Sequence, residues 1–154
     1  MAISWEEASK RLDSAANILN SEIPGPHEGP IHVGIDLGTS DVVLMVLDDN
    51  GEPLAAFLEW AEVVRDGVVV DFVGAVDIVR SLLEKAEKKL SVVITSASTS
   101  FPPGTDPRLS TNILETAGLD VTKVLDEPSC VANLLLLDKT AVVDVGGGTT
   151  GTAV

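Results

Sequence analysis

The sequence predicts an α/β fold in which a mixed sheet begins as an antiparallel meander, continues with parallel strands and carries helices on both faces. Residues 31–58 contain three short apolar runs separated by turn residues, a pattern typical of antiparallel strands. Residues 74–145 alternate helical and strand patterns, and such alternation requires crossover connections between parallel strands. The chain of 154 residues is long enough for one domain with a sizeable core.

The first 30 residues are predicted to form a helix and a linker that precede the main domain at residues 31–154. Ser4 and Glu7 have the spacing of a capping box, and apolar residues then recur every three or four positions as far as Leu19. The linker contains three prolines and two glycines within ten residues, which interrupt a helix. We expect the apolar stripe of the helix to pack on its own domain or on a neighbouring molecule.

Turn and helix-end residues define the elements of the main domain. Asn50 and Gly51 predict a tight primed turn within the meander, because both residues tolerate the left-handed conformation that such a turn demands. Gly118 ends one predicted helix, and Pro128 fits the first turn of the next. In chain order, the predicted elements are strands 31–36, 42–47 and 54–58, extended segment 63–70, helix 74–90, strand 92–96, helix 107–117, strand 121–125, helix 128–137 and a buried strand 140–145.

Two turns share one composition, in which an acid ends an apolar run and glycine and hydroxyl residues follow at once. Either turn alone is more often an ordinary hairpin, but both occur in the same strand-turn-strand pattern, at residues 31–47 and 141–154. Glycine N–H groups and hydroxyls bind phosphate oxygens, and Asp36 and Asp144 can hold Mg²⁺ through water. The predicted phosphate ligands are Gly38, Thr39, Ser40, Gly146, Gly147, Gly148, Thr149 and Thr150.

Glu127 is predicted to lie at the C-terminal end of a strand, where ligands of open α/β sheets bind. From there a glutamate could orient or deprotonate a water that attacks a terminal phosphate, with Asp36 and Asp144 beside it. An acid in the first turn of a helix is also favourable next to the macrodipole and needs no substrate. The residues alone leave both interpretations of Glu127 open.

Charge and composition exclude several classes of partner. The formal net charge of −14 disfavours DNA, RNA and anionic membrane surfaces, and no apolar run is long enough to span a bilayer. The N-terminus is polar and acidic, unlike a signal peptide, so we expect a cytoplasmic protein. Cys130 is the single cysteine and is predicted to be a small buried side chain, while His27 and His32 lack the spacing of metal ligands.

Three motifs, in order along the chain, resemble the motifs of the actin, Hsp70 and sugar-kinase superfamily. The first phosphate motif is Asp36-Leu37-Gly38-Thr39-Ser40, the connecting helix begins at Asp126-Glu127-Pro128-Ser129, and the second phosphate motif is Asp144-Val145-Gly146-Gly147-Gly148-Thr149-Thr150-Gly151. This resemblance implies a ribonuclease-H-like, actin-like ATPase domain that binds ATP and magnesium. It implies magnesium held through water by Asp36 and Asp144, and the hydrolytic water near Glu127. No lysine stands where Hsp70 chaperones place a catalytic lysine, and Arg65 is the candidate substitute.

The Hsp70 and bacterial-actin branches give the nearest resemblance, through Ala117-Gly118-Leu119 and the segment from Arg65 to Phe72. Within them, the chain is similar to Hsp70-like chaperone-type proteins encoded with ethanolamine-degrading enzymes and microcompartment shells, which implies such enzymes or shell proteins as partners. A non-catalytic actin-like scaffold is the alternative. A sugar or carboxylate kinase is a third option, less favoured because Glu127-Pro128 fits the hydrolysing branches better.

Members of this superfamily close two similar lobes over the nucleotide. The adenosine-binding motif and the second connecting helix belong to the other lobe, and residues 31–154 contain nothing that matches them. We therefore expect this chain to be the first lobe of a longer protein, to bind ATP weakly or not at all by itself, and to self-associate through an exposed sheet edge.

Overall fold

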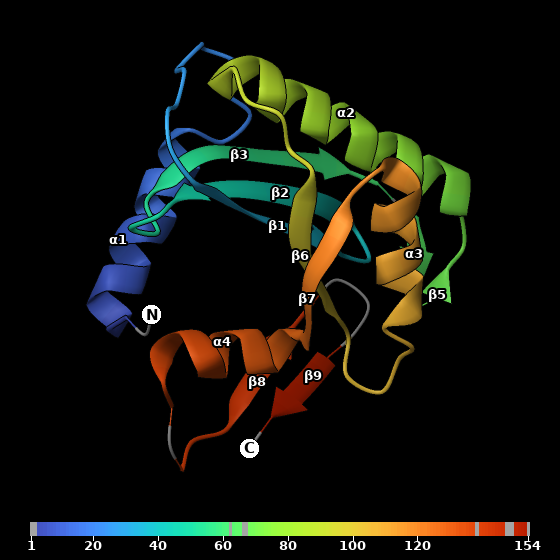
Figure 1. Ribbon diagram of the computed structural model, residues 1–154. Helices are drawn as coiled ribbons and strands as arrows, with labels where there is room; N and C mark the ends of the chain where they lie inside the picture. Colours follow the sequence, from blue (N-terminus) through green and yellow to red (C-terminus); the bar gives the residue numbers. More distant parts are fainter. Residues whose placement is uncertain (1–2, 62, 66–67, 138, 147–149, 154) are drawn as a thin grey trace.

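The computed structural model describes residues 3–61, 63–65, 68–137, 139–146 and 150–153 (Figure 1). Four helices and nine strands lie within these ranges. In chain order they are α1 (Trp5–Asn17), β1 (Ile31–Leu37), β2 (Asp41–Asp48), β3 (Pro53–Trp60), β4 (Val64–Arg65), β5 (Val68–Val69), α2 (Phe72–Leu90), β6 (Ser96–Phe101), α3 (Arg108–Ala117), β7 (Asp120–Asp126), α4 (Glu127–Leu135), β8 (Val142–Val145) and β9 (Thr150–Ala153).

Five strands form one mixed sheet in the order β3-β2-β1-β6-β7. The β1–β2 and β2–β3 pairs are antiparallel, whereas the β1–β6 and β6–β7 pairs are parallel. The prediction of a meander followed by parallel strands is therefore confirmed. Two further pairs, β4–β5 and β8–β9, form small antiparallel hairpins of their own.

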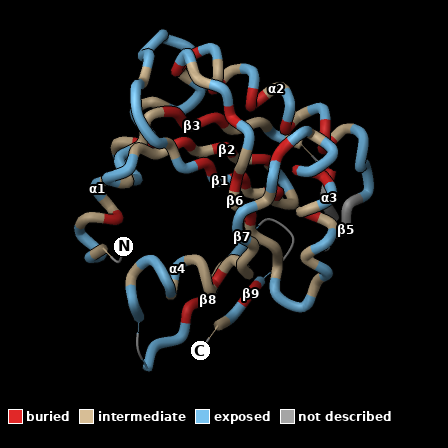
Figure 2. Tube along the Cα trace, in the orientation of Figure 1, coloured by how far each residue is buried: buried red, intermediate tan, exposed pale blue. Residues whose placement is uncertain are grey.

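The hydrophobic core lies between this sheet and helices α2 and α3 (Figure 2). Alternate residues of β1 and β2 are buried on that face, because successive strand side chains point to opposite faces of a sheet. The opposite face carries α1 against β3 and α4 against β6 and β7, so helices cover both faces as predicted. The strand residues buried in the core are Val33, Ile35, Leu37, Val42, Leu44, Val46, Ala55, Phe57 and Ala97.

Helix α1 packs on its own domain. Residue Leu19, just after the helix, forms a parallel bridge with Ala56 of β3. The Asn20 side chain donates to the carbonyl of Leu58 at 3.1 Å and accepts from its N–H at 2.9 Å, as a neighbouring strand would. These contacts cover part of the β3 edge.

The turn between β2 and β3 differs from the predicted primed turn. Gly51 has φ +81°, but Asn50 is absent from the described residues with positive φ. The Asp48 carboxylate accepts from the N–H groups of Asn50 and Glu52, at 2.8 and 2.9 Å. These side-chain hydrogen bonds hold the turn with a single residue, Gly51, in the left-handed conformation. The prediction that Asn50 also adopts this conformation is therefore wrong.

Two predicted strands also differ from the structure. The strand expected at residues 92–96 begins only at Ser96, because the N–H of Ile94 bonds the Glu87 side chain instead of a neighbouring strand. The strand expected to be buried at 140–145 is β8, which pairs with β9 outside the main sheet. Its residues Val143 and Val145 are 60% and 76% exposed, so burial holds for Val142 alone among its valines.

None of the helices in the described ranges combines the length and apolar character needed to cross a bilayer.

Candidate functional site

The described residues of the two predicted phosphate turns line one cavity of about 480 Å³. The first turn follows β1, and the second follows β8, more than one hundred residues later. Helix α4 begins at the same cavity, so all three sequence motifs meet there. The lining residues described are Asp36, Gly38, Thr39, Ser40, Asp41, Ser100, Pro102, Glu127, Cys130, Asp144, Val145 and Gly146.

Parallel pairing explains why Asp36 and Glu127 converge. Strands β1, β6 and β7 run in one direction, so their C-terminal ends lie along one edge of the sheet. Asp36 lies near the end of β1, and Glu127 follows β7 as the first residue of α4. The Asp126 carboxylate accepts from the N–H of Ser129 at 3.0 Å, and Pro128 occupies the first turn. This N-cap fixes where the helix starts.

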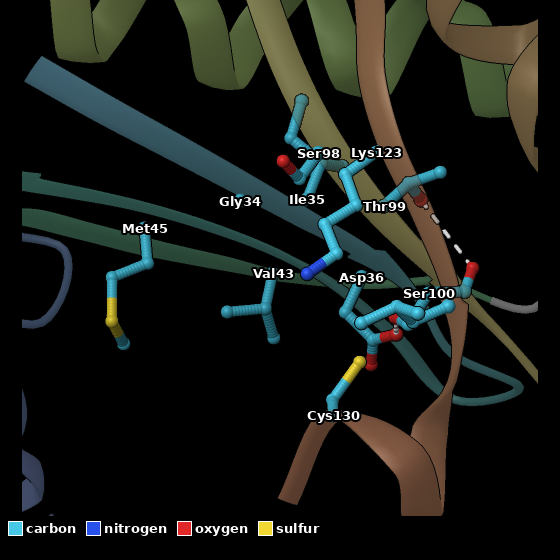
Figure 3. A pocket seen from close by; sticks show the side chains of 11 residues that line it. Gly34, Ile35, Asp36, Val43, Met45, Ser98, Thr99, Ser100, Lys123 and Cys130 are labelled. Atoms are coloured by element: carbon cyan, nitrogen blue, oxygen red, sulfur yellow. Dashed lines mark hydrogen bonds between the residues drawn. The ribbon is translucent and has the colours of Figure 1, made fainter. Parts of the chain in front are cut away.

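Ser100 binds Asp36 across the sheet. The Ser100 hydroxyl on β6 donates to Oδ1 of Asp36 on β1, and Figure 3 shows the two side chains together at the rim of an adjoining cavity. Burial raises the pKa of Asp36 above its ordinary value, and the charges of Asp41 and Asp144 act in the same direction. The hydrogen bond from Ser100 opposes that rise. Sequence reasoning missed Ser100, since one serine in a strand gives no indication of the acid on the neighbouring strand.

Glu127 has a pKa raised to about 7. Burial is the largest cause, followed by the charge of Asp36, a hydrogen bond with Asp144, and the charges of Asp144 and Asp126. A helix macrodipole alone would lower the pKa of an N-terminal acid. Burial and the surrounding acids together therefore outweigh the macrodipole, and a pKa near 7 is the range that suits a general base.

The donor set of the cavity fits magnesium held through water. The described part of the chain contains no group of three or more His, Cys, Asp or Glu residues placed to hold a metal directly. Magnesium keeps several waters and takes one or two carboxylates, which Asp36 and Asp144 provide. The described lining includes four carboxylates and no Lys, Arg or His. A phosphate would be repelled there unless a divalent cation entered with it.

Cys130 also lines the cavity, from α4. It is partly exposed rather than buried, contrary to the prediction for this residue. Burial raises the pKa of the Cys130 thiol, and the charges of Asp126, Asp36 and Glu127 add to the rise. Such a shift lowers the thiolate fraction at neutral pH.

The remaining predicted residues are not placed at the cavity by the structure. Gly147, Gly148 and Thr149 lie outside the described residues. Arg65 ends β4, and its side chain also lies outside the described part. Thr150 is exposed at the start of β9 and is not among the lining residues described.

Comparison with known proteins places this chain among close relatives of one kind. It is 56% identical over 144 residues to the ethanolamine utilization protein EutJ of Salmonella typhimurium, covering 94% of this chain and 51% of that protein. It is 54% identical over 154 residues to EutJ of Escherichia coli K12, covering 100% of this chain and 55% of that protein. The chain thus spans about half the length of the curated relatives it matches. No family model matches the chain.

Solved structures agree with these relatives. The crystal structure of EutJ from Carboxydothermus hydrogenoformans superposes with TM-score 0.87 at 43% identity, covering 97% of this chain and 56% of that one. MreB 5 of Spiroplasma citri gives TM-score 0.59 at 18% identity, with coverage of 82% and 49%. A MamK double helical filament gives TM-score 0.53 at 20% identity, covering 78% of this chain and 48% of that one. The last two likenesses show the fold alone, which is that of the actin-like ATPases.

Proposed function

We propose that this chain forms the phosphate-binding half of an adenine-nucleotide site. Two findings support this proposal: the chain is homologous to EutJ over about half of that protein's length, and it has the actin-like ATPase fold. The whole protein would be an ATP-binding, Hsp70-like chaperone-type protein of ethanolamine utilization. The observation that carries this proposal is the convergence of Asp36, Glu127 and Asp144 on one cavity with both glycine turns.

Seven of the described lining residues have a role in this proposal. The N–H groups of Gly38 and Gly146 and the hydroxyls of Thr39 and Ser40 would donate to phosphate oxygens. Asp36 and Asp144 would hold Mg²⁺ through water, and the ion would neutralise phosphate charge that the four carboxylates otherwise repel.

Glu127 would accept a proton from the water that attacks the terminal phosphate. A pKa of about 7 leaves much of Glu127 ionised at neutral pH and able to take that proton. A glutamate with this pKa lies in the same cavity as the turns proposed to bind phosphate. This combination supports ATP hydrolysis over ATP binding alone. Arg65, Gly147, Gly148, Thr149 and Thr150 complete the proposed nucleotide contacts on the resemblance alone.

The proposed partners are ethanolamine-utilization enzymes or microcompartment proteins in the cytoplasm. The name of the relatives supports the first part of this proposal, and a net charge of −14 argues against nucleic acid or an anionic membrane as partner.

A non-catalytic scaffold is the second candidate function. One structural neighbour is a MamK double helical filament, and β7 ends the main sheet as an edge strand. An uncovered edge can pair with another chain, so self-association through β7 would suit an assembly role. The MreB neighbour, in contrast, is described as bound to AMPPNP, which supports the nucleotide proposal.

Cys130 allows a direct test, because it is the single cysteine of the sequence and lines the cavity. The rate of Cys130 alkylation by iodoacetamide would be measured with and without magnesium-ATP, in this chain and in a version extended to the length of its relatives. We expect protection in the extended protein, weaker protection in this chain, and none in Asp144→Asn of either. Isothermal titration of magnesium-ATP gives the matching affinities.

Equal alkylation rates with and without magnesium-ATP in both proteins would contradict the nucleotide proposal. The scaffold candidate then leads. It gains further if partner binding by the extended protein is unchanged in Glu127→Ala and Asp144→Asn, since a chaperone cycle would need turnover to release its partner.

A further inference from the structure

The hydrogen bond between Ser100 and Asp36 joins two neighbouring parallel strands at the cavity. The register pairs Gly34 with Ser98 and Ile35 with Thr99, so the next residues along, Asp36 and Ser100, lie side by side on the face that carries α4. Both residues line the 480 Å³ cavity and the adjoining cavity of about 260 Å³ shown in Figure 3.

This hydrogen bond uses one oxygen of the Asp36 carboxylate and leaves the other available to a ligand. Oδ1 accepts from the Ser100 hydroxyl, while Oδ2 has no hydrogen-bond partner among the described residues. A carboxylate fixed through one oxygen presents the second in a defined direction. That geometry suits a group that must accept from a water bound to a cation, because outer-shell partners orient the groups that hold the metal.

The acids around Asp36 make such a restraint necessary. Asp41, Glu127 and Asp144 line the same cavity, and mutual repulsion favours rotation of the Asp36 side chain away from them. The described lining of the 480 Å³ cavity contains no Lys, Arg or His to counteract this repulsion, and Lys123 lines the adjoining cavity. The Ser100 hydroxyl is the side-chain donor that the structure describes for Asp36.

We propose that Ser100 is a positioning residue, whose hydroxyl holds the Asp36 carboxylate so that Oδ2 faces the magnesium and phosphate cavity. This inference rests on the proposed function and adds a residue that the three phosphate and helix motifs do not contain. Ser100 acts through Asp36 and need not touch the nucleotide.

The test measures Mn²⁺ binding without nucleotide, by electron paramagnetic resonance and calorimetry, in matched variants. Ser100→Val and Ser100→Thr have nearly the same shape, but only Thr keeps the hydroxyl. Ser98→Ala is the control on the same strand and face, because the Ser98 hydroxyl pairs with Thr122 at 3.1 Å, away from Asp36. We expect Ser100→Val and Ser100→Ala to bind Mn²⁺ about tenfold more weakly, with Ser100→Thr and Ser98→Ala near wild type.

The inference would be overturned by wild-type affinity in Ser100→Val, or by no Mn²⁺ binding by the wild-type protein. An equal loss in Ser100→Thr and Ser100→Val would also overturn it, since the hydroxyl would then be irrelevant. The two proposals can fail separately. If Mn²⁺ binding depends on Ser100 but magnesium-ATP does not protect Cys130, the positioning role of Ser100 is supported and the nucleotide proposal is contradicted.

Discussion

Gly151 lies against Pro128 in a contact that has no room for a side chain. A β-carbon at position 151 would lie 3.0 Å from Cγ of Pro128 and 2.8 Å from Cδ of Pro103. Gly151 is also the residue directly opposite Asp144 in the β8–β9 hairpin. Pro128 follows Glu127, so this close approach packs the hairpin that carries Asp144 against the start of the helix that carries Glu127.

Replacing Gly151 should therefore separate the two acids. In Gly151→Ala the hairpin must shift away from the prolines, which we expect to cost about 1–3 kcal/mol in the free energy of unfolding. Because the hydrogen bond and charge of Asp144 raise the pKa of Glu127, the pKa of Glu127 should fall from about 7 toward its ordinary value. Carboxyl titration by NMR measures it, with exposed Thr152→Ala on the same strand as control. An unchanged pKa would show that this contact does not place Asp144.

Glu127 should make the protein less stable as the pH rises. Its folded pKa of about 7 exceeds the ordinary value, so the folded state holds the proton more tightly than the unfolded chain. The resulting stabilisation is fully present below about pH 4.5 and is lost as the pH rises through 7. Glu127→Gln removes this titration. Because Glu127 is partly exposed, we expect a gain over wild type of about 1 kcal/mol at pH 8, or roughly 2–4 °C in Tm.

Thermal unfolding of both proteins between pH 4.5 and 8 checks this prediction. The difference in Tm should be near zero at the acidic end and grow with pH. A constant difference across the range would mean that Glu127 is not the titrating group.

Asp144→Asn should change stability and binding in opposite directions. The substitution removes a negative charge that raises the pKa values of both Asp36 and Glu127, so the free protein should unfold at a higher temperature at pH 8. It also removes one of the two carboxylates proposed to hold magnesium, so protection of Cys130 by magnesium-ATP should be lost. The matched control is Asp120→Asn, since Asp120 is exposed at the start of β7. A parallel loss of stability and binding would point to a folding defect instead.

Asn20→Ala should expose the β3 edge. The side chain bonds both backbone groups of Leu58, so its loss leaves two strand groups without these partners and should cost about 1–2 kcal/mol. The uncovered edge should also favour dimers, detectable by light scattering during size-exclusion chromatography. Asn112→Ala, on an exposed position of α3, is the control and should remain at wild-type size and stability. No increase in association would exclude the β3 edge as a pairing surface.

The order and type of most elements could be predicted because they depend on local patterns. Apolar runs separated by turn residues predicted β1 and β2, Gly118 predicted the end of α3 and Pro128 the start of α4, and these agree with the structure. The errors arose where side chains a few residues away compete for the backbone N–H groups. The Glu87 side chain bonds Ile94 and delays β6, and the Asp48 carboxylate changes the turn at Asn50.

Burial of β8 could not be predicted for a related reason. An apolar run of four to six residues is typical of a buried strand, but burial requires a covering layer on both sides. Helix α4 covers one side of β8, and the valines of the other side are exposed in the structure.

The α/β class, the order of the elements along the chain and the three acids of the candidate site follow from local patterns, because acid-glycine-hydroxyl turns and a glutamate before proline are local features. The tertiary structure decided what those acids do to one another. It alone placed Ser100 beside Asp36, packed Gly151 against Pro128 and raised the pKa of Glu127 to about 7. The physical reason is that charge coupling and close packing depend on distances between strands far apart in sequence, and those distances follow from the parallel sheet and the β8–β9 hairpin.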